Sequence, residues 1–262
     1  MNLVGKTIIV TGASSGIGER IAHHIAQRGG NLLLTARSIE KLKNLQTELI
    51  NTYSIECQIY KADLLDLTAW KSTLGEMIQD VPKIDAIINN AGFGIFDKVE
   101  DSKWEDTENM FRLNVFALIQ GIHELLPHFI SNRCGHIVNI ASQAGKISTP
   151  KSSAYAATKH AVIGFSNALR LEVEEYGIHV TSVNLGPVAT NFFTKADPSG
   201  TYQKSVRKLM LDPDKVARQV VSNLFSKKRE INMPKWMDIG SRIYQVFPSL
   251  VEKMLRKQLN RK

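Results

Sequence analysis

The chain has 262 residues, of which 43% are hydrophobic and 22% charged, which suits one large globular domain with its own core. Its formal net charge is +8, but residues 227–262 contain ten Lys/Arg and three Asp/Glu, or +7, so the first 226 residues carry only +1. The body therefore lacks the basic stripe of a nucleic-acid-binding surface, and no apolar run approaches the roughly eighteen residues of a membrane-spanning helix.

The N-terminus and the cysteines predict a cytoplasmic protein. The opening residues, MNLVGKTIIVTG, hold too short an apolar run for a signal peptide and lead directly into a strand pattern. The two cysteines, Cys57 and Cys134, form no CxxC pair and are expected to be reduced. The seven histidines are scattered without metal-ligand spacing, so no metal site is expected.

Apolar, β-rich runs alternate with amphipathic stretches along the chain. Strands are predicted over 7–12, 31–36, 55–64, 84–92, 135–142, 178–186 and 230–234. Helices are predicted over 18–29, 38–51, 67–80, 103–131, 153–176 and 212–226, with a long loop and a short helix over 188–211.

The predicted strands are continuous apolar runs, which indicates a parallel sheet covered on both faces. We therefore expect a single α/β domain, a Rossmann-like doubly wound parallel sheet of about seven strands with helices on both faces. Residues 1–234 would form this domain, which includes the long loop over 188–211. Residues 235–262 would form a basic C-terminal helical extension.

The first strand–helix junction reads TGASSGIG, residues 11–18. Glycine permits positive φ and close approach of the backbone to a ligand, and the helix that follows offers free N–H groups to a phosphate. A glycine-rich turn that only packs strand against helix is the alternative. The motif follows a buried strand and precedes a helix, and this position favours phosphate binding.

The stretch SAYAATKH places Tyr155 and Lys159 four residues apart, on one face of the predicted helix. Such a pair can be an ordinary helix face or a reactive pair, and its spacing alone does not decide.

The order and spacing of several motifs resemble those of the classical short-chain dehydrogenase/reductases over about residues 5–233. The motifs are Thr11 to Gly18, Asn89-Asn90-Ala91-Gly92, Asn114, Ser142, Tyr155, Lys159 and Gly186-Pro187. The resemblance implies hydride transfer between a nicotinamide dinucleotide and a carbonyl or a secondary alcohol.

The resemblance also assigns roles to the reactive residues. Tyr155 would be the general acid/base, and Lys159 would lower its pKa and bind the nicotinamide ribose. Ser142 would hold the substrate oxygen, and Asn114 would maintain a proton relay through water. Taken singly, Ser142 could be a loop serine and Asn114 an ordinary helix residue.

NADP(H) is the expected cofactor. An acid at the end of the second strand would favour NAD(H), but Ala36 and Arg37 stand there, and a guanidinium can bind a 2′-phosphate. Arg37 could instead be a solvated arginine, and Asp63 a helix cap rather than an adenine contact. The expected cofactor-binding residues are Gly12, Ser14, Ser15, Gly16, Ile17, Gly18, Arg37, Asp63, Leu64, Asn90, Ala91, Gly92, Tyr155, Lys159, Pro187, Val188 and Thr190.

The substrate is expected between the loop after the fifth strand and residues 188–211. Candidate lining residues are Phe93, Phe96, Gln143, Ile147, Phe192, Phe193 and Met210, with Lys146 and Lys195 as the only charges. This set favours reduction of an apolar ketone or aldehyde. Alcohol oxidation and a non-catalytic dinucleotide-binding module remain the alternatives.

The C-terminal segment from Pro248 is predicted to be a helix. Leu250, Val251, Met254 and Leu255 form its apolar stripe, flanked by Lys253, Arg256 and Lys257. The helix would close the substrate pocket or form an oligomer interface, or residues 248–262 would contact a membrane surface. By resemblance, the helices over 103–131 and 153–176 would pair in a homodimer or homotetramer.

Overall fold

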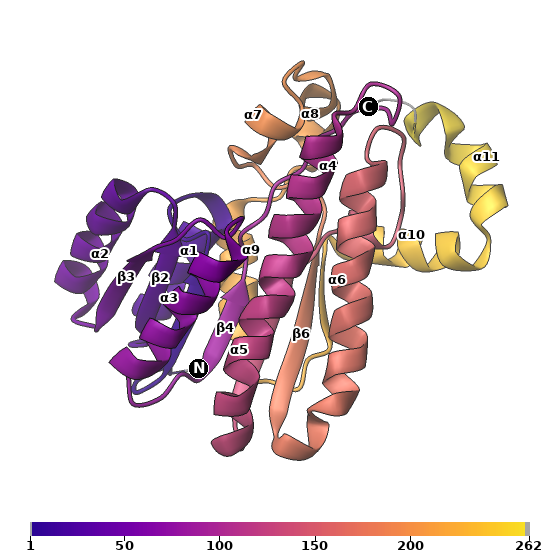
Figure 1. Cartoon of the computed structure of the whole chain (residues 1–262). Coiled ribbons are helices and arrows are strands. Elements are labelled where there is room, and N and C mark those ends of the chain that lie inside the picture. The colour runs from indigo at the N-terminus through magenta and orange to yellow at the C-terminus, as the bar shows by residue number, and fades with distance from the viewer. Residues whose placement is uncertain (1, 260–262) are drawn as a thin grey trace.

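The computed structural model describes the backbone of residues 2–259 and the side chains of residues 2–254. Its centre is a seven-stranded parallel sheet in the order β3-β2-β1-β4-β5-β6-β7 (Figure 1). The strands are β1 (Thr7–Thr11), β2 (Asn31–Ala36), β3 (Cys57–Lys61), β4 (Ala86–Asn89), β5 (Gly135–Ile140), β6 (Ile178–Leu185) and β7 (Glu230–Met233). The sheet confirms the predicted fold class.

Helices cover both faces of the sheet, because side chains alternate between the faces along each buried strand. In β1, Ile8 and Val10 face one core cluster and Ile9 faces the other. The first cluster packs under α1 (Gly16–Ala26), α2 (Ile39–Tyr53) and α9 (Pro213–Ser222). The second packs under α3 (Leu67–Asp80), α5 (Ala117–Ser131) and α6 (Ser153–Glu172).

The predicted helix over 103–131 is divided in the structure. It consists of α4 (Trp104–Phe111), a π-helical segment (Arg112–Phe116) and α5. A π-helical turn within an α-helix often marks a functional site, and this one contains Asn114.

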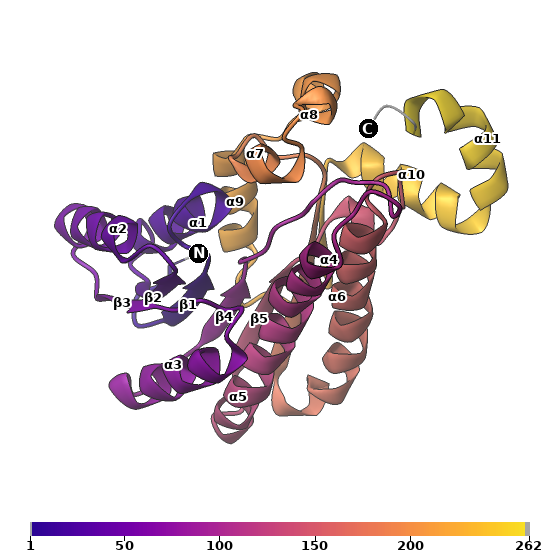
Figure 2. The same ribbon diagram turned by 45° about the horizontal axis from the view of Figure 1, so that its top comes forward.

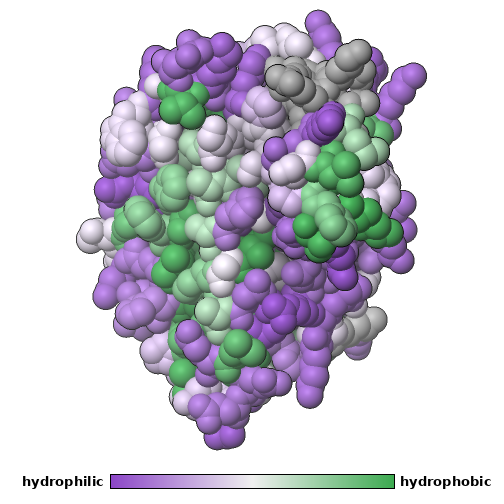
Figure 3. Space-filling model, turned by 90° about the vertical axis from the view of Figure 1, so that its right-hand side faces the viewer, coloured by the Kyte–Doolittle hydropathy of each residue, from purple (hydrophilic) through white to green (hydrophobic). Residues whose placement is uncertain are grey.

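The polypeptide after β6 and after β7 forms the walls at the carboxyl ends of the strands. Two short helices, α7 (Phe192–Ala196) and α8 (Thr201–Val206), follow β6. After β7 come α10 (Lys235–Val246) and α11 (Pro248–Leu259), so the C-terminal extension contains one helix more than predicted. In Figures 1 and 2, α7 and α8 lie across from α10 and α11 at one end of the molecule. Hydrophobic residues gather on the surface that faces the viewer in Figure 3.

Candidate active site

A cavity of about 1280 Å³ runs along the carboxyl ends of the strands. This volume exceeds that of a typical small-ligand pocket, about 300–1,000 Å³, so the cavity can hold a dinucleotide and a second molecule together. Nearly all the expected cofactor-binding residues line it: Gly12, Ser14, Ser15, Gly16, Ile17, Arg37, Asp63, Leu64, Asn90, Ala91, Gly92, Tyr155, Lys159, Pro187, Val188 and Thr190. Residues that are far apart in the sequence thus meet in one cavity.

The glycine-rich loop between β1 and α1 fits a phosphate group. Gly12 and Gly16 have φ of +64° and +62°, which L side chains rarely adopt. Ser15, the N-cap of α1, forms no side-chain capping hydrogen bond, so it leaves the first N–H groups of the helix available. These groups and the positive end of the helix dipole are suited to a pyrophosphate.

Gly18 allows close packing in the structure, and its predicted cofactor contact stays a prediction. It does not line the cavity, and a Cβ there would lie 2.4 Å from the Gly12 carbonyl oxygen and 2.6 Å from Asn90 Nδ2. Asn90 in turn donates from Nδ2 to the carbonyl oxygen of Thr11 at 2.9 Å. Gly18 therefore allows α1 to pack closely on the loop, and Asn90 both supports the loop and lines the cavity.

The end of β2 presents positive charge and no carboxylate. Ala36 ends the strand, and Arg37 follows it at the cavity wall. Lys41, in the first turn of α2, also lines the cavity and was not predicted. The signal that could have identified it was its place in the first turn of the helix predicted to follow the second strand.

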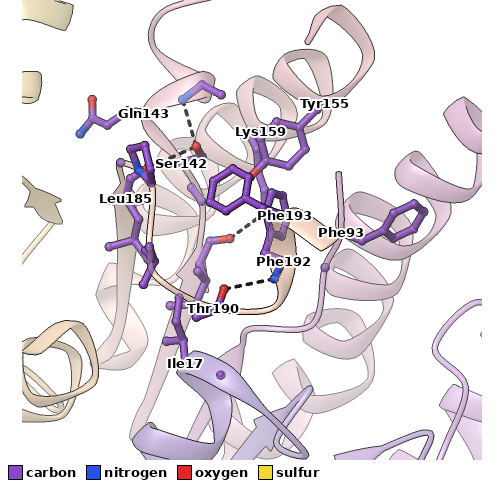
Figure 4. Close-up of a pocket in the computed structure, with 18 of the residues that line it drawn as sticks. Ile17, Phe93, Ser142, Gln143, Tyr155, Lys159, Leu185, Thr190, Phe192 and Phe193 are labelled. Atoms are coloured by element: carbon purple, nitrogen blue, oxygen red, sulfur yellow. Dashed lines mark hydrogen bonds between the residues drawn. The ribbon is translucent and has the colours of Figure 1, made fainter. Parts of the chain in front are cut away.

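Tyr155 lies at the opposite end of the cavity, on α6, with Ser142 and Lys159 beside it (Figure 4). Burial raises the pKa of Tyr155 to about 12, while the hydrogen bond with Ser142 acts in the opposite direction. The phenol therefore carries its proton at neutral pH in the protein alone.

Lys159 is buried one turn along α6. Its Nζ donates to the carbonyl oxygen of Ile140 at 3.0 Å and lies 5.8 Å from the centre of the Tyr155 ring. Burial lowers the pKa of Lys159 to about 8, so it remains cationic at pH 7. An ammonium has three donors, and the described residues engage one of them, which leaves two for a ribose at the cavity wall.

Ser142 follows β5. Its Oγ donates to the carbonyl oxygen of Leu185 at 3.2 Å and accepts from Ala144 N at 3.0 Å. Rotation of the hydroxyl hydrogen alone would redirect this donor to a substrate oxygen.

Asn114, predicted to maintain a proton relay, lies behind the cavity wall and not in its lining. Its Oδ1 accepts from Phe93 N at 3.0 Å, and its Nδ2 donates to Phe93 O at 2.8 Å and Thr158 Oγ1 at 3.1 Å. Asn114 thus joins the loop after β4 to α6, next to Lys159. The geometry gives it a positioning role, and a water relay to Lys159 stays a prediction.

Aromatic rings surround the Tyr155 phenol. The centre of the Phe96 ring lies 5.7 Å from that of Tyr155, and the Phe192 ring centre lies 5.8 Å from it. Phe193 and Tyr202 pack against Phe96 from α7 and α8. This wall makes the reactive end of the cavity apolar.

Most of the residues predicted to contact the substrate line the cavity. Those that line the cavity are Phe93, Phe96, Gln143, Ile147, Phe192, Phe193 and Lys195. Met210 does not line it. Lys146 points elsewhere, and its Nζ forms ion pairs with Glu230 at 2.7 Å and Asp238 at 2.9 Å.

The C-terminal helices complete the cavity. Their lining residues are Trp236, Met237, Gly240, Ile243, Tyr244, Leu250, Val251 and Met254. Leu250, Val251 and Met254 belong to the predicted apolar stripe, whereas no residue of α10 was predicted to line the cavity. The apolar spacing of Trp236, Ile239 and Ile243 was the signal that could have identified that helix.

Within the described residues, no cluster of three or more metal-ligating side chains occurs. Nor does that part of the chain contain a helix of the length and hydropathy needed to cross a bilayer.

The site fits a nicotinamide dinucleotide, and comparisons with known proteins agree. Residues 6–199 match the family model of the short chain dehydrogenases. The chain is 34% identical over 238 residues to the dehydrogenase/reductase SDR family member 7B of Xenopus laevis, covering 87% of this chain and 74% of that protein. It is 36% identical over 192 residues to an NADP-dependent 3-hydroxy acid dehydrogenase of Schizosaccharomyces pombe, covering 72% and 74%.

A solved structure of similar fold is a short-chain dehydrogenase from Sphingobium yanoikuyae in complex with NADPH. It superimposes with a TM-score of 0.80 at 25% sequence identity, covering 93% of this chain and 95% of that one. The motifs, the parallel sheet, the cavity and the family match coincide in one region. The chain belongs to the short-chain dehydrogenase/reductase family of NAD(P)-dependent oxidoreductases.

Proposed function

We propose that the protein is an NADP(H)-dependent reductase of an apolar ketone or aldehyde. The carrying observation is the protonated phenol of Tyr155 enclosed by aromatic side chains. A proton donor in an apolar pocket suits a carbonyl that must gain a proton, whereas oxidation of an alcohol would need the phenolate. Supply of the substrate and cellular cofactor ratios still set the net direction.

When bound, the reduced nicotinamide would supply a hydride to the carbonyl carbon. Ser142 would donate a hydrogen bond to the carbonyl oxygen, which polarises it. The Oη–H bond of Tyr155 would break as the proton moves to that oxygen, leaving an alcohol and a phenolate. The cationic Lys159 would stabilise the phenolate until solvent returns the proton.

The NADP(H) preference rests on Arg37 and Lys41, which flank the cavity where an NAD(H) enzyme would present an acid. The NADPH-bound neighbour and the NADP-dependent relative support it. We expect Arg37→Ser to lower kcat/KM for NADPH by about 10–100-fold and to leave the value for NADH nearly unchanged, because a charge-assisted contact contributes roughly 1.5–3 kcal/mol.

Lys43→Ser is the matched control, since Lys43 is a nearby basic residue on α2 that lies outside the cavity. Initial rates with both cofactors, measured on a panel of aliphatic and aromatic ketones, aldehydes and 3-oxo acids, provide the readout. If Arg37→Ser lowered kcat/KM equally for NADPH and NADH, the proposed contact between Arg37 and the 2′-phosphate would be rejected. Turnover confined to small, strongly polar carbonyls would reject the substrate class.

A further inference from the structure

The C-terminal helices expose an unusual concentration of apolar side chains. Fourteen large hydrophobic side chains are exposed within the described residues, and half of them lie in α10, α11 and their junction. These seven are Trp236 (56%), Ile239 (61%), Ile243 (50%), Val246 (67%), Phe247 (58%), Leu250 (57%) and Met254 (71%). We call them the apolar row. A contiguous patch of this kind on a protein surface marks an interaction site.

The apolar row is the outer face of an amphipathic pair of helices. Positions 236, 239, 243 and 246 recur at helical spacing, so they share one face of α10. The opposite face is fixed to the body: Ser241 is fully buried, and Asp238 forms an ion pair with Lys146. The inner face of α10 thus packs on the body of the protein, and the apolar row on its outer face does not.

Positive charge accompanies the row. Residues 235–262 contain seven Lys/Arg and two Asp/Glu, a net charge of +5. Across the cavity, residues 188–211 contain Lys195, Lys204, Arg207 and Lys208 against one acid, Asp197, a net charge of +3. An apolar face on a segment whose sequence carries net positive charge is complementary to the acyl chains and headgroups of an anionic bilayer. A second copy of this face would instead bring like charges together.

The row also borders the entrance of the active-site cavity. Trp236, Ile243, Leu250 and Met254 line the cavity and are at the same time half or more exposed. Phe192 and Phe193 of α7 form the wall on the other side. In Figure 3, hydrophobic residues on the α10–α11 side are bordered by hydrophilic ones. An apolar substrate could thus pass from a lipid phase to Tyr155 without crossing water.

We infer that α10 and α11 lie in the headgroup region of an anionic phospholipid bilayer, with the apolar row buried and the cavity entrance facing the lipid. The docking depends on the row and its charge and not on the proposed carbonyl substrate. A binding measurement therefore tests it separately from turnover.

The three tryptophans provide a position-specific test. Trp236 belongs to the row, Trp104 on α4 is 78% exposed, and Trp70 is fully buried. The full-length protein is mixed with vesicles of phosphatidylcholine and phosphatidylglycerol that carry brominated acyl chains. In the Trp104→Phe variant we expect strong quenching of fluorescence. We expect the Trp236→Phe variant still to bind the vesicles but to lose most of the fluorescence quenching.

A second pair of variants tests the row itself. Ile239 and Val246 are exposed but do not line the cavity. We expect Ile239→Gln/Val246→Gln to weaken vesicle binding in a flotation assay by about tenfold or more. The control is Val4→Gln/Val99→Gln, because those side chains are 70% and 73% exposed elsewhere on the molecule. Raising NaCl from about 0.1 M to about 1 M should release the wild-type protein.

Several results would overturn the proposal. These are no flotation with anionic vesicles, equal binding to phosphatidylcholine alone, or quenching of Trp104 rather than Trp236. A change of oligomeric state in the Ile239→Gln/Val246→Gln variant without vesicles would show that a second copy covers the row. Loss of carbonyl turnover with vesicle binding retained would reject the proposed function and leave the docking intact.

Discussion

Tyr155 is held as a proton donor by its surroundings. Desolvation by the aromatic wall opposes the phenolate, and the ammonium of Lys159 favours it once it forms. The pKa must fall by about 5 units from about 12 for the phenolate to be abundant at pH 7, which is about 7 kcal/mol. The positive charge of an oxidised nicotinamide would act in that direction, and the protonated phenol supports the proposed reductase function.

Removing the Tyr155 hydroxyl tests this arrangement. We expect Tyr155→Phe to lower kcat about 10²–10⁴-fold, the usual contribution of a general acid, with the Kd for NADPH within a factor of about three. Stopped-flow kinetics and calorimetry measure the two quantities. Tyr202→Phe, in the same aromatic wall, is the control, and it should lower kcat by less than about tenfold. Near-wild-type turnover in Tyr155→Phe would assign the proton to another group.

At the scale of elements, the loops and helices around the site are joined by polar contacts between distant parts of the chain. The Lys146 Nζ bonds Glu230, Asn232 and Asp238, at 2.7, 3.1 and 2.9 Å. It thereby ties the loop after Ser142 to β7 and to α10. Lys146 is a positioning residue for the cavity wall.

Loss of this ammonium should loosen α10. We expect Lys146→Met to lower the free energy of unfolding by about 2–4 kcal/mol, because two partly buried carboxylates lose their partner. KM for the carbonyl should rise more than kcat falls, and limited proteolysis should cut residues 235–259 faster. Lys98→Met is the control, since its ion pair with Glu100 has a similar distance of 2.8 Å but is exposed. Equal effects of the two substitutions would contradict the positioning role.

The strands and most helices were predictable, because apolar runs of 4–8 residues and helical spacing are local signals. The site residues that line the cavity followed from motifs at strand ends. The contacts of Asn114 and Lys146 could not be predicted because their partners lie far away in the sequence: Phe93 is 21 residues from Asn114, and Asp238 is 92 residues from Lys146. The π-helical turn likewise has no local sequence signal.

At the scale of the molecule, acid should destabilise the fold through His136. This side chain is fully buried between Thr181 Oγ1 at 2.9 Å and Phe225 N at 2.8 Å, and burial lowers its pKa to about 3. Between pH 6.5 and 3, the unfolded chain binds a proton at this position that the folded chain does not. Stability therefore falls as pH decreases through that window, by at most about 5 kcal/mol.

Urea unfolding at a series of pH values measures the slope of the unfolding free energy against pH. We expect His136→Gln to flatten it, whatever its effect on absolute stability. His123→Gln, at an exposed position, should leave it unchanged. An unaltered slope in the His136 variant would assign the acid sensitivity to other groups.

We propose that the protein forms a homodimer or homotetramer through α4, α5 and α6. Trp104 on α4, Phe116 in the π-helical segment before α5 and Leu171 on α6 are 78%, 50% and 73% exposed. Phe116→Glu should shift the protein toward monomer in sedimentation velocity, because a charge at an apolar contact is costly. Val4→Glu is the control. A Phe116→Glu protein that sediments as the wild type does would rule this face out.

The strand order fixes when the parts of the molecule can assemble during synthesis. β1 pairs with β2 and also with β4, so the centre of the sheet cannot form until residue 89 has left the ribosome. β7 joins β6 at the edge, and α10 and α11 follow it. The dinucleotide half can thus fold while the last residues are still being made, as domains generally fold from the N-terminus during translation. The entrance to the cavity is completed last, and the nascent enzyme can bind its cofactor before it can enclose a substrate.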